Sequence, residues 1–344
     1  MQIRNQINAA IGYLERSQLP SGQFRVQMMN FANDPERRTV EEDEALFATA
    51  HIAYSLGFVP ENGAKAMIGK SLEYFKQQMT GHGLWRHWNK SARRGGISLY
   101  SFIPADLDDM ASICYLLQKH GISFPDNRCL FFGNRNRLGL YYTWLMARPT
   151  LSFSLVYWWS MLREFRPQRF TIFFSTTEAS YLDVDGVVNA NVALYLGNCP
   201  QTVPVLNWIE QIVEQGLEAE CDKWYRDRYT FYYAVSRVQL EGVSLTEGLK
   251  LRAISRICED TNPTGCIGSN ILQTALAVCA LMSFGCKKIV VSAAIQAIMD
   301  AQQPDGSWAS ETYYYGGPQL SARWGSSELT TGICLEALAR YQSI

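Results

Sequence analysis

The sequence has almost no net charge and no long uninterrupted hydrophobic run. Its 344 residues include 31 basic and 32 acidic side chains, a balance that disfavours nucleic-acid binding through bulk charge. The longest apolar stretch, 138–165, is interrupted by Arg148 and Pro149. Neither half reaches the ~20 residues that a bilayer-spanning helix needs. The first residues lack the apolar core of a signal peptide, so we expect a cytoplasmic protein without a transmembrane segment.

Paired cysteines and strand-like patterns are also scarce. The nine cysteines are an odd number and show no Cys-x-x-Cys spacing, which favours small core residues over a disulfide framework or a zinc site. Helical periodicity dominates instead. Start and stop signals predict helices near 2–17, 41–56, 61–79, 106–119, 136–147, 152–164, 184–196, 201–216, 228–240, 246–258, 269–284, 287–302 and 327–341.

Short and long connections alternate between these helices. Short Gly or Pro turns lie at 57–60, 197–200, around Gly242 and at 285–286; long loops cover 18–40, 80–105, 217–227, 259–268 and 303–326. Because short turns join antiparallel neighbours, every long loop falls on one face, where we expect function. Hairpins in series form either an open solenoid or a closed ring. Six inner helices, beginning near 41, 106, 184, 228, 269 and 327, predict an all-α (α/α)6 barrel as one domain over 1–344.

Three long loops share a turn pattern after an outer helix. In 18–24, 78–85 and 302–308, a Gln is followed by a turn with Gly and then an aromatic residue. We interpret the pattern as a clasp, in which the Gln amide meets the aromatic ring and free helix-end groups while Gly permits the turn. The expected role is structural.

Acidic side chains gather where the inner helices are expected to start. These residues are Glu41, Glu42, Asp43, Asp106, Asp108, Asp109, Asp183, Asp185 and Glu328. Capping explains any one of them, because a helix start needs only one acceptor. Three carboxylates within 106–109 exceed that need, and repulsion with desolvation is expected to keep at least one protonated. A neutral carboxylic acid at the mouth of an apolar barrel suits Brønsted-acid catalysis.

The stretch 106–111, Asp-Leu-Asp-Asp-Met-Ala, resembles the DxDDTA signature of class II terpene cyclases, the superfamily of squalene–hopene and diterpene cyclases. The clasp at 302–308 resembles that superfamily's QW motif. The resemblance implies that Asp108 protonates a terminal alkene or epoxide of a small hydrophobic isoprenoid, with Asp106 and Asp109 tuning and orienting it. Protonation itself then requires no cofactor. Met110 stands where the family has Thr.

Known members of that superfamily generally pair two barrels, and this chain has room for one. A lone barrel must enclose its substrate or complete the cavity with a partner, so a homo-oligomer or a second barrel subunit is expected as an alternative. Aromatic faces suit the carbocations that follow protonation. Candidates for the substrate pocket are Tyr315, Trp324, Arg323, Asp185, Asn189 and Glu328, with further aromatic residues in 229–233.

A diphosphate substrate would need further groups. Asp185 and Asn189 share a helix face and would bind Mg²⁺ for it, or Asn189 would bond the Asp108 acid. Basic residues on long loops that suit a diphosphate are Lys90, Arg93, Arg94 and Arg323.

Two other functions remain open from the sequence. A six-hairpin carbohydrate-active enzyme would use Asp108 as general acid and Asp185 or Glu328 as base or nucleophile. A non-catalytic binding scaffold would keep its acids only as caps. The four histidines offer no metal-ligand pattern, so zinc and protein prenylation are not expected.

Overall fold

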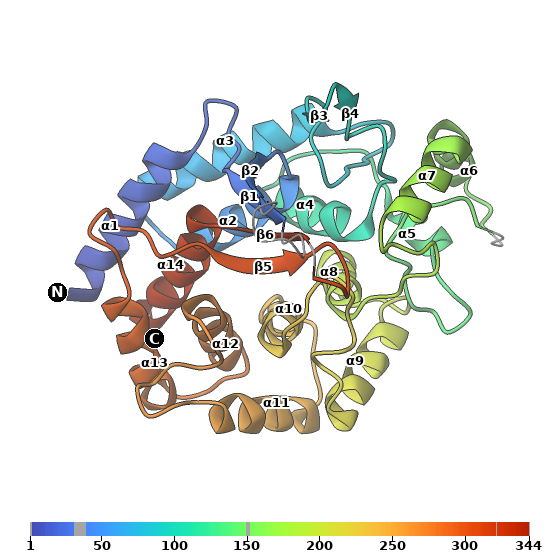
Figure 1. Ribbon diagram of the computed structural model, residues 1–344. Coiled ribbons are helices and arrows are strands. Elements are labelled where there is room, and N and C mark those ends of the chain that lie inside the picture. The colour runs from blue at the N-terminus through green and yellow to red at the C-terminus, as the bar shows by residue number, and fades with distance from the viewer. Residues whose placement is uncertain (1, 31–38, 149–151, 321, 344) are drawn as a thin grey trace.

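The computed structural model describes residues 2–30, 39–148, 152–320 and 322–343. Six helices form a closed inner ring, in which each packs against the next and the last against the first (Figure 1). They are α2 (Leu46–Leu56), α4 (Leu107–Lys119), α8 (Gly186–Leu196), α10 (Arg228–Leu240), α12 (Ile271–Ser283) and α14 (Ser327–Ser343). Most residues of these helices are buried on all sides of the helix. The predicted (α/α)6 barrel and its six inner helices are confirmed.

The outer layer consists of helices that bury one stripe only, as amphipathic helices do. They are α1 (Gln2–Ser17), α3 (Asn62–Gln78), α9 (Val203–Gln215), α11 (Glu247–Glu259) and α13 (Lys288–Asp300). Between α4 and α8 this layer is built from α5 (Arg128–Gly133), α6 (Leu155–Glu164) and α7 (Pro167–Thr176). Inner helices connect to outer ones by short turns. All inner N-termini therefore lie at one end of the barrel, which we call the mouth.

Strands, which the sequence did not predict, cover part of the mouth. The order β2-β1-β6-β5 makes an antiparallel sheet from β1 (Val26–Asn30), β2 (Thr39–Asp43), β5 (Glu311–Tyr315) and β6 (Ala322–Ser326). A short hairpin joins β3 (Arg93–Arg94) to β4 (Ile97–Ser98). The expected helix at 41–56 is wrong at its start, since 41–43 belong to β2. Half of the main sheet comes from each end of the chain, so no local hairpin pattern reveals the whole.

The expected helix at 136–147 is also wrong. Residues 136–139 form a turn, in which the Gly139 N–H donates to the Asn136 carbonyl at 3.1 Å. Residues 140–145 then run extended beside the start of α4: the Leu107 N–H donates to the Thr143 carbonyl at 2.8 Å, and the Thr143 N–H donates to the Asp183 carbonyl at 2.9 Å. A short apolar run fits a strand or a helix equally well, and here neighbours on both sides select the extended form. The unexpected helix α7 begins at Pro167, where the missing N–H of proline costs nothing.

Two clasps tie outer helices together. The Gln302 side-chain amide donates to the carbonyls of Gln6 and Gly306, both at 3.0 Å, which joins the end of α13 to α1. The Gln18 amide similarly donates to the Met67 carbonyl of α3 at 2.9 Å. The indole N–H of Trp308 meets the Ile298 carbonyl at 2.7 Å. Thus the glutamine bonds the neighbouring helix and its own turn, rather than the aromatic ring as expected.

The cysteines are less buried than expected. All nine are free thiols, but only Cys114, Cys279 and Cys334 are fully buried. Burial raises the pKa of Cys114 to about 12, which keeps this thiol protonated and inert.

Candidate active site

A cavity of about 720 Å³, partly open to solvent, lies at the mouth. Its walls are mainly aromatic, and its polar groups include the three carboxyls at the start of α4. The aromatic lining residues are Phe47, Trp88, Trp144, Phe173, Trp224, Tyr225, Tyr314, Tyr315 and Trp324. No lysine or arginine is among the lining residues in the described part of the chain. Of the expected pocket residues, Tyr315 and Trp324 line this cavity together with Asp106, Asp108 and Asp109.

The three carboxyls at the start of α4 are all buried. Asp106 caps the helix, because its Oδ1 accepts the Asp109 N–H at 2.9 Å. Burial, reinforced by the neighbouring carboxyls, raises the pKa of Asp106 well above its usual value and that of Asp109 to about 8. Asp106 Oδ2 and Asp109 Oδ1 accept no hydrogen bond from any residue that the structure describes. These two side chains are therefore suited to remain neutral.

Asp108 differs because both of its oxygens are hydrogen-bonded. The Asn191 amide donates to Oδ1 and the Tyr225 hydroxyl donates to Oδ2, each at 2.5 Å. Burial raises the pKa of Asp108, whereas these two bonds and the charge of Arg237 oppose the rise. Asp108 is thus a buried acid whose conjugate base has stabilising donors already in place.

Arg237 fixes the amide that bonds the acid. Its guanidinium donates to Asn191 Oδ1. Because a guanidinium carries donors only, it turns the amide oxygen toward itself and the NH₂ toward Asp108. Arg237 is buried on α10 beside the rings of Tyr54 and Tyr233, at 5.0 and 4.9 Å from their centroids.

Asn189 was expected to bond Asp108 or to bind a metal ion, but its side chain is bonded elsewhere. Its side chain donates to the carbonyls of Tyr141 and Asp185 at 2.9 Å and accepts the Tyr141 N–H at 2.9 Å. It pins the extended segment 140–145 to α8. The amide that bonds Asp108 is Asn191, two residues further along the helix.

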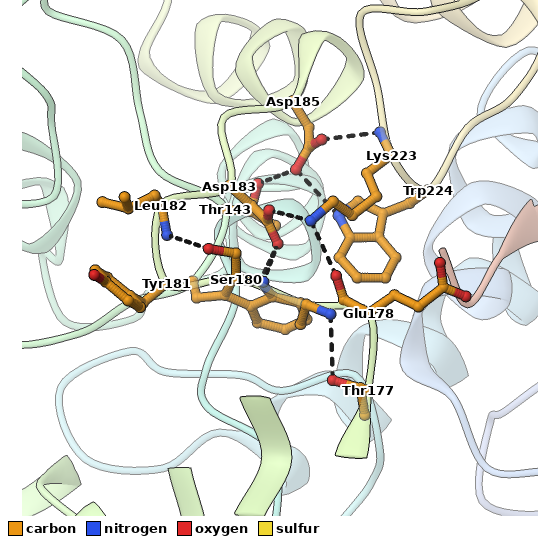
Figure 2. A network of polar contacts seen from close by, with 12 residues as sticks. Thr143, Thr177, Glu178, Ser180, Tyr181, Leu182, Asp183, Asp185, Lys223 and Trp224 are labelled. Atoms are coloured by element: carbon orange, nitrogen blue, oxygen red, sulfur yellow. Dashed lines mark hydrogen bonds and ion pairs between the residues drawn. The ribbon is translucent and has the colours of Figure 1, made fainter. Parts of the chain in front are cut away.

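Three other buried carboxylates at the mouth hold tryptophans of the cavity wall. Asp43 accepts the indole N–H of Trp88 at 2.9 Å and that of Trp324 at 2.6 Å. Asp183 accepts that of Trp144 and Asp185 that of Trp224, both at 3.1 Å. Figure 2 shows Asp183 and Asp185 around Lys223, whose ammonium pairs with Asp183. The acids predicted at the mouth therefore divide into cavity-facing and wall-supporting sets.

Asp185 does not fit the expected Mg²⁺ site. Its oxygens accept from the Thr143 hydroxyl at 2.5 Å, the Lys223 backbone N–H at 2.9 Å and the Trp224 indole, as Figure 2 shows. Burial raises the pKa of Asp185 to about 6, although these bonds oppose the rise. Its lone pairs face donors rather than an open position, and it is absent from the cavity lining. No cluster of three metal-binding side chains occurs among the described residues.

The remaining candidates lie away from the cavity. Glu328 lies in the first turn of α14; burial raises its pKa, but it is not a lining residue. The Arg323 guanidinium lies 5.7 Å from the centroid of the Tyr315 ring, and Arg323 is not a lining residue. Lys90 donates to backbone carbonyls of α3 and its end, and Arg94 lies 3.7 Å from Glu41. The cavity lining does not include Lys90, Arg93, Arg94 or any residue of 229–233.

Sequence reasoning passed over His87, which lines the cavity. Its Nδ1 lies 3.7 Å from Asp109 Oδ2, and its Nε2 lies 3.3 Å from the Tyr314 hydroxyl. Burial lowers its pKa, which keeps the imidazole neutral near pH 7. His87 follows the 78–85 clasp in a long loop, and no local pattern marks it. Tyr225 was similarly missed, although it lies in one of the long loops expected to carry function.

Solved structures share this fold. The type II terpene cyclase MstE from Scytonema matches with a TM-score of 0.71 at 16% identity, covering 99% of both chains. A variant in complex with geranylgeranyl dihydroxybenzoate, described as its substrate, gives 0.70 at 16% identity, covering 99% of this chain and 98% of that one.

Two further structures match less closely. The ent-copalyl diphosphate synthase from Streptomyces platensis gives a TM-score of 0.52 at 17% identity, covering 86% of this chain and 50% of its own. A possible member of the GH105 family from Salmonella enterica gives 0.53 at 9% identity, covering 99% of this chain and 93% of its own. No family model and no curated protein matches the sequence. The chain therefore has the helical barrel fold of the type II terpene cyclases.

Proposed function

We propose that the protein is a class II, protonation-initiated terpene cyclase-like enzyme that acts on a linear isoprenoid, with Asp108 as Brønsted acid. The observation that carries the proposal is the setting of Asp108. It is a buried carboxyl on an aromatic cavity, bonded by Asn191 and Tyr225 at 2.5 Å. Burial raises the pKa of Asp108 and so favours its protonated form, and the two donors stabilise the carboxylate that forms when it gives up its proton.

In this mechanism Asp108 transfers its proton to a terminal alkene or epoxide oxygen. Its O–H bond breaks, and a C–H or O–H bond forms on the substrate. The carboxylate left behind holds its charge against the Asn191 N–H and the Tyr225 O–H. The Arg237 charge behind Asn191 adds attraction at longer range. The substrate cation then closes its rings and ends by losing a proton or adding water.

The tryptophan walls suit the cationic stage. Aromatic faces attract cations, and four of the indoles here donate their N–H to Asp43, Asp183 or Asp185. Such bonds fix each ring and place an anionic acceptor at its edge. Preorganised walls of this kind stabilise charge that develops during the reaction.

The cavity favours an uncharged substrate portion. Its described lining has no lysine or arginine, so a diphosphate bound within it would lack a counter-charge. MstE is described with an isoprenoid joined to dihydroxybenzoate, and a head group of that kind, which carries less negative charge than a diphosphate, suits this lining better. We propose no metal for the reaction, because the residues around Asp185 do not fit one.

We propose that one 1–344 domain houses the whole cavity, whose described lining residues all come from this barrel.

Among the described residues, the site does not favour the carbohydrate alternative. Asp185 is bonded to wall residues, and Glu328 lies outside the cavity. Neither therefore faces Asp108 across an open groove, as glycoside chemistry requires.

The test is turnover of candidate substrates. Geranylgeranyl dihydroxybenzoate, geranylgeranyl diphosphate, farnesyl diphosphate and squalene would be incubated separately with the wild type and with Asp108→Asn. We expect a cyclised product from at least one substrate and its loss in the variant. Asn keeps the shape of the side chain and one oxygen that can accept a hydrogen bond, but its NH₂ cannot supply the acidic proton. Absence of product from all four with folded protein, or full activity of Asp108→Asn, contradicts the proposal.

A further inference from the structure

The hairpin of α6 and α7 exposes an unusual amount of apolar surface. Among the described residues, eighteen large hydrophobic side chains are exposed, and nine of them lie within 153–182. Phe153 is 97% exposed and Leu155 84%. The others are Trp158, Trp159, Leu162, Phe165, Ile172, Tyr181 and Leu182. We call these nine residues the apolar face. Exposed apolar side chains concentrated in one segment indicate an interaction site.

The charge around the apolar face is positive. Arg163, Arg166 and Arg169 are interleaved with it, and none forms an ion pair with a described residue. Glu164, the acid between them, turns inward and pairs with the buried Arg86. Arg169 reaches only a backbone carbonyl, that of Ser101, at 3.1 Å. The segment 153–182 holds these three arginines against two acids, Glu164 and Glu178, so its net charge is positive.

The apolar face adjoins the cavity through α7. Phe173 and Thr177 of α7 line the cavity, and the Phe173 ring lies 5.0 Å from that of Trp144. Phe170 and Phe174, on the same helix, line a shallow apolar hollow with Phe165 and Tyr181 of the face. In Figure 1 the two helices project from the barrel beside the mouth. Helix α7 therefore contributes both to the apolar face and to the cavity that holds the acids.

We propose that α6 and α7 dock the protein on the surface of a lipid bilayer, where the cavity receives its apolar substrate directly. Trp, Tyr and Phe favour the region between acyl chains and headgroups, and arginines bind the phosphates there. No described helix is long and apolar enough to cross a membrane, so the docking is superficial. A symmetric second copy fits less well, because it brings the unpaired arginines of both copies together.

Flotation with lipid vesicles tests the docking. The probes are vesicles of phosphatidylcholine alone and of phosphatidylcholine mixed with phosphatidylglycerol. We expect the wild type to float with both, and more strongly with the anionic mixture. A triple variant, Trp158→Ser with Trp159→Ser and Leu162→Ser, should weaken partitioning by a factor of about ten or more. Leu251→Ser with Ile289→Ser, which changes exposed side chains on α11 and α13, is the matched control and should float like the wild type.

The arginines provide a second measurement. Arg163→Gln with Arg166→Gln should weaken binding to anionic vesicles by about fivefold for each arginine and leave neutral vesicles nearly unaffected. Failure of the wild type to float, or equal flotation of the triple variant and the wild type, overturns the proposal. Self-association that the triple variant abolishes, without vesicle binding, assigns the face to a second copy instead. Asp108→Asn should float normally, so docking and catalysis fail independently.

Discussion

Replacing Tyr225 by Phe removes one hydroxyl from the acid's surroundings. Among the described residues, that hydroxyl bonds only Asp108 Oδ2, at 2.5 Å. The ring keeps its contacts with Phe47 and Tyr313, whose centroids lie 5.8 and 5.9 Å away. The substitution therefore tests a single bond to the proposed proton donor.

The size of the effect follows from the charge of Asp108. The bond contributes about 1.5–3 kcal/mol when the acceptor is a carboxylate and about 1 kcal/mol when it is neutral. Its loss therefore raises the barrier to proton transfer by about 0.5–2 kcal/mol, which lowers kcat by a factor of about 2–30. The same difference raises the pKa of Asp108 by about 0.4–1.5 units. This direction agrees with the lowering influence of Tyr225 on that pKa.

The assay is kcat as a function of pH. Asp108 works only while protonated, so activity falls as pH rises through its pKa. In Tyr225→Phe that alkaline fall should move to higher pH while the maximum kcat declines. Tyr315→Phe, which changes another cavity tyrosine whose hydroxyl does not bond Asp108, is the matched control and should remain within about twofold of wild type.

Two results would refute the reasoning. A lower kcat with an unmoved alkaline limb means that Tyr225 acts on the substrate rather than on the acid. Wild-type values for both quantities mean that the bond does not operate during turnover.

Three further predictions concern stability. The folded pKa of Asp109, about 8, exceeds its unfolded value, so its contribution to the free energy of unfolding is fully present below about pH 4 and is lost as pH rises through 8. In chemical denaturation, the free energy of unfolding of Asp109→Asn should therefore rise relative to that of the wild type over this interval. A difference that stays constant with pH would contradict the raised pKa. Gly306 has φ +95°, and a Cβ there would lie 2.3 Å from the Ala9 carbonyl oxygen, whereas Gly285 has φ +87° with open space around it. Gly285→Ala should therefore cost about 1–2 kcal/mol and Gly306→Ala clearly more, as read from the free energy of unfolding; equal losses would deny the close approach. Gln302→Ala should lower the free energy of unfolding by about 1 kcal/mol for each of the two hydrogen bonds of Gln302. The control is Gln296→Ala, because the exposed Gln296 amide bonds only Asp300 of its own helix. Thermal unfolding should show a clear loss for the first variant and little change for the control.

The inner helices were predictable because most of them carry apolar residues around the whole helix and most of the turns that follow them contain Gly or Pro. The candidate site at the start of α4 was predictable because three carboxyls in four residues exceed what a helix cap requires. The prediction of a helix at 136–147 was wrong because a short apolar run has no preference of its own between helix and strand. Segments 105–107 and 183, distant in sequence, hold it extended.

The sequence by itself determined the barrel, the face on which its long loops gather, and the cluster at 106–109. Tertiary structure alone decided which residues meet that cluster. Tyr225 and Asn191 come from a loop and a helix far along the chain, and both reach Asp108 only once the ring has closed. It also decided that Asp43, Asp183 and Asp185 support tryptophans instead of facing the cavity. Local patterns report the periodicity of an element, whereas the partner of a carboxylate depends on how distant elements pack.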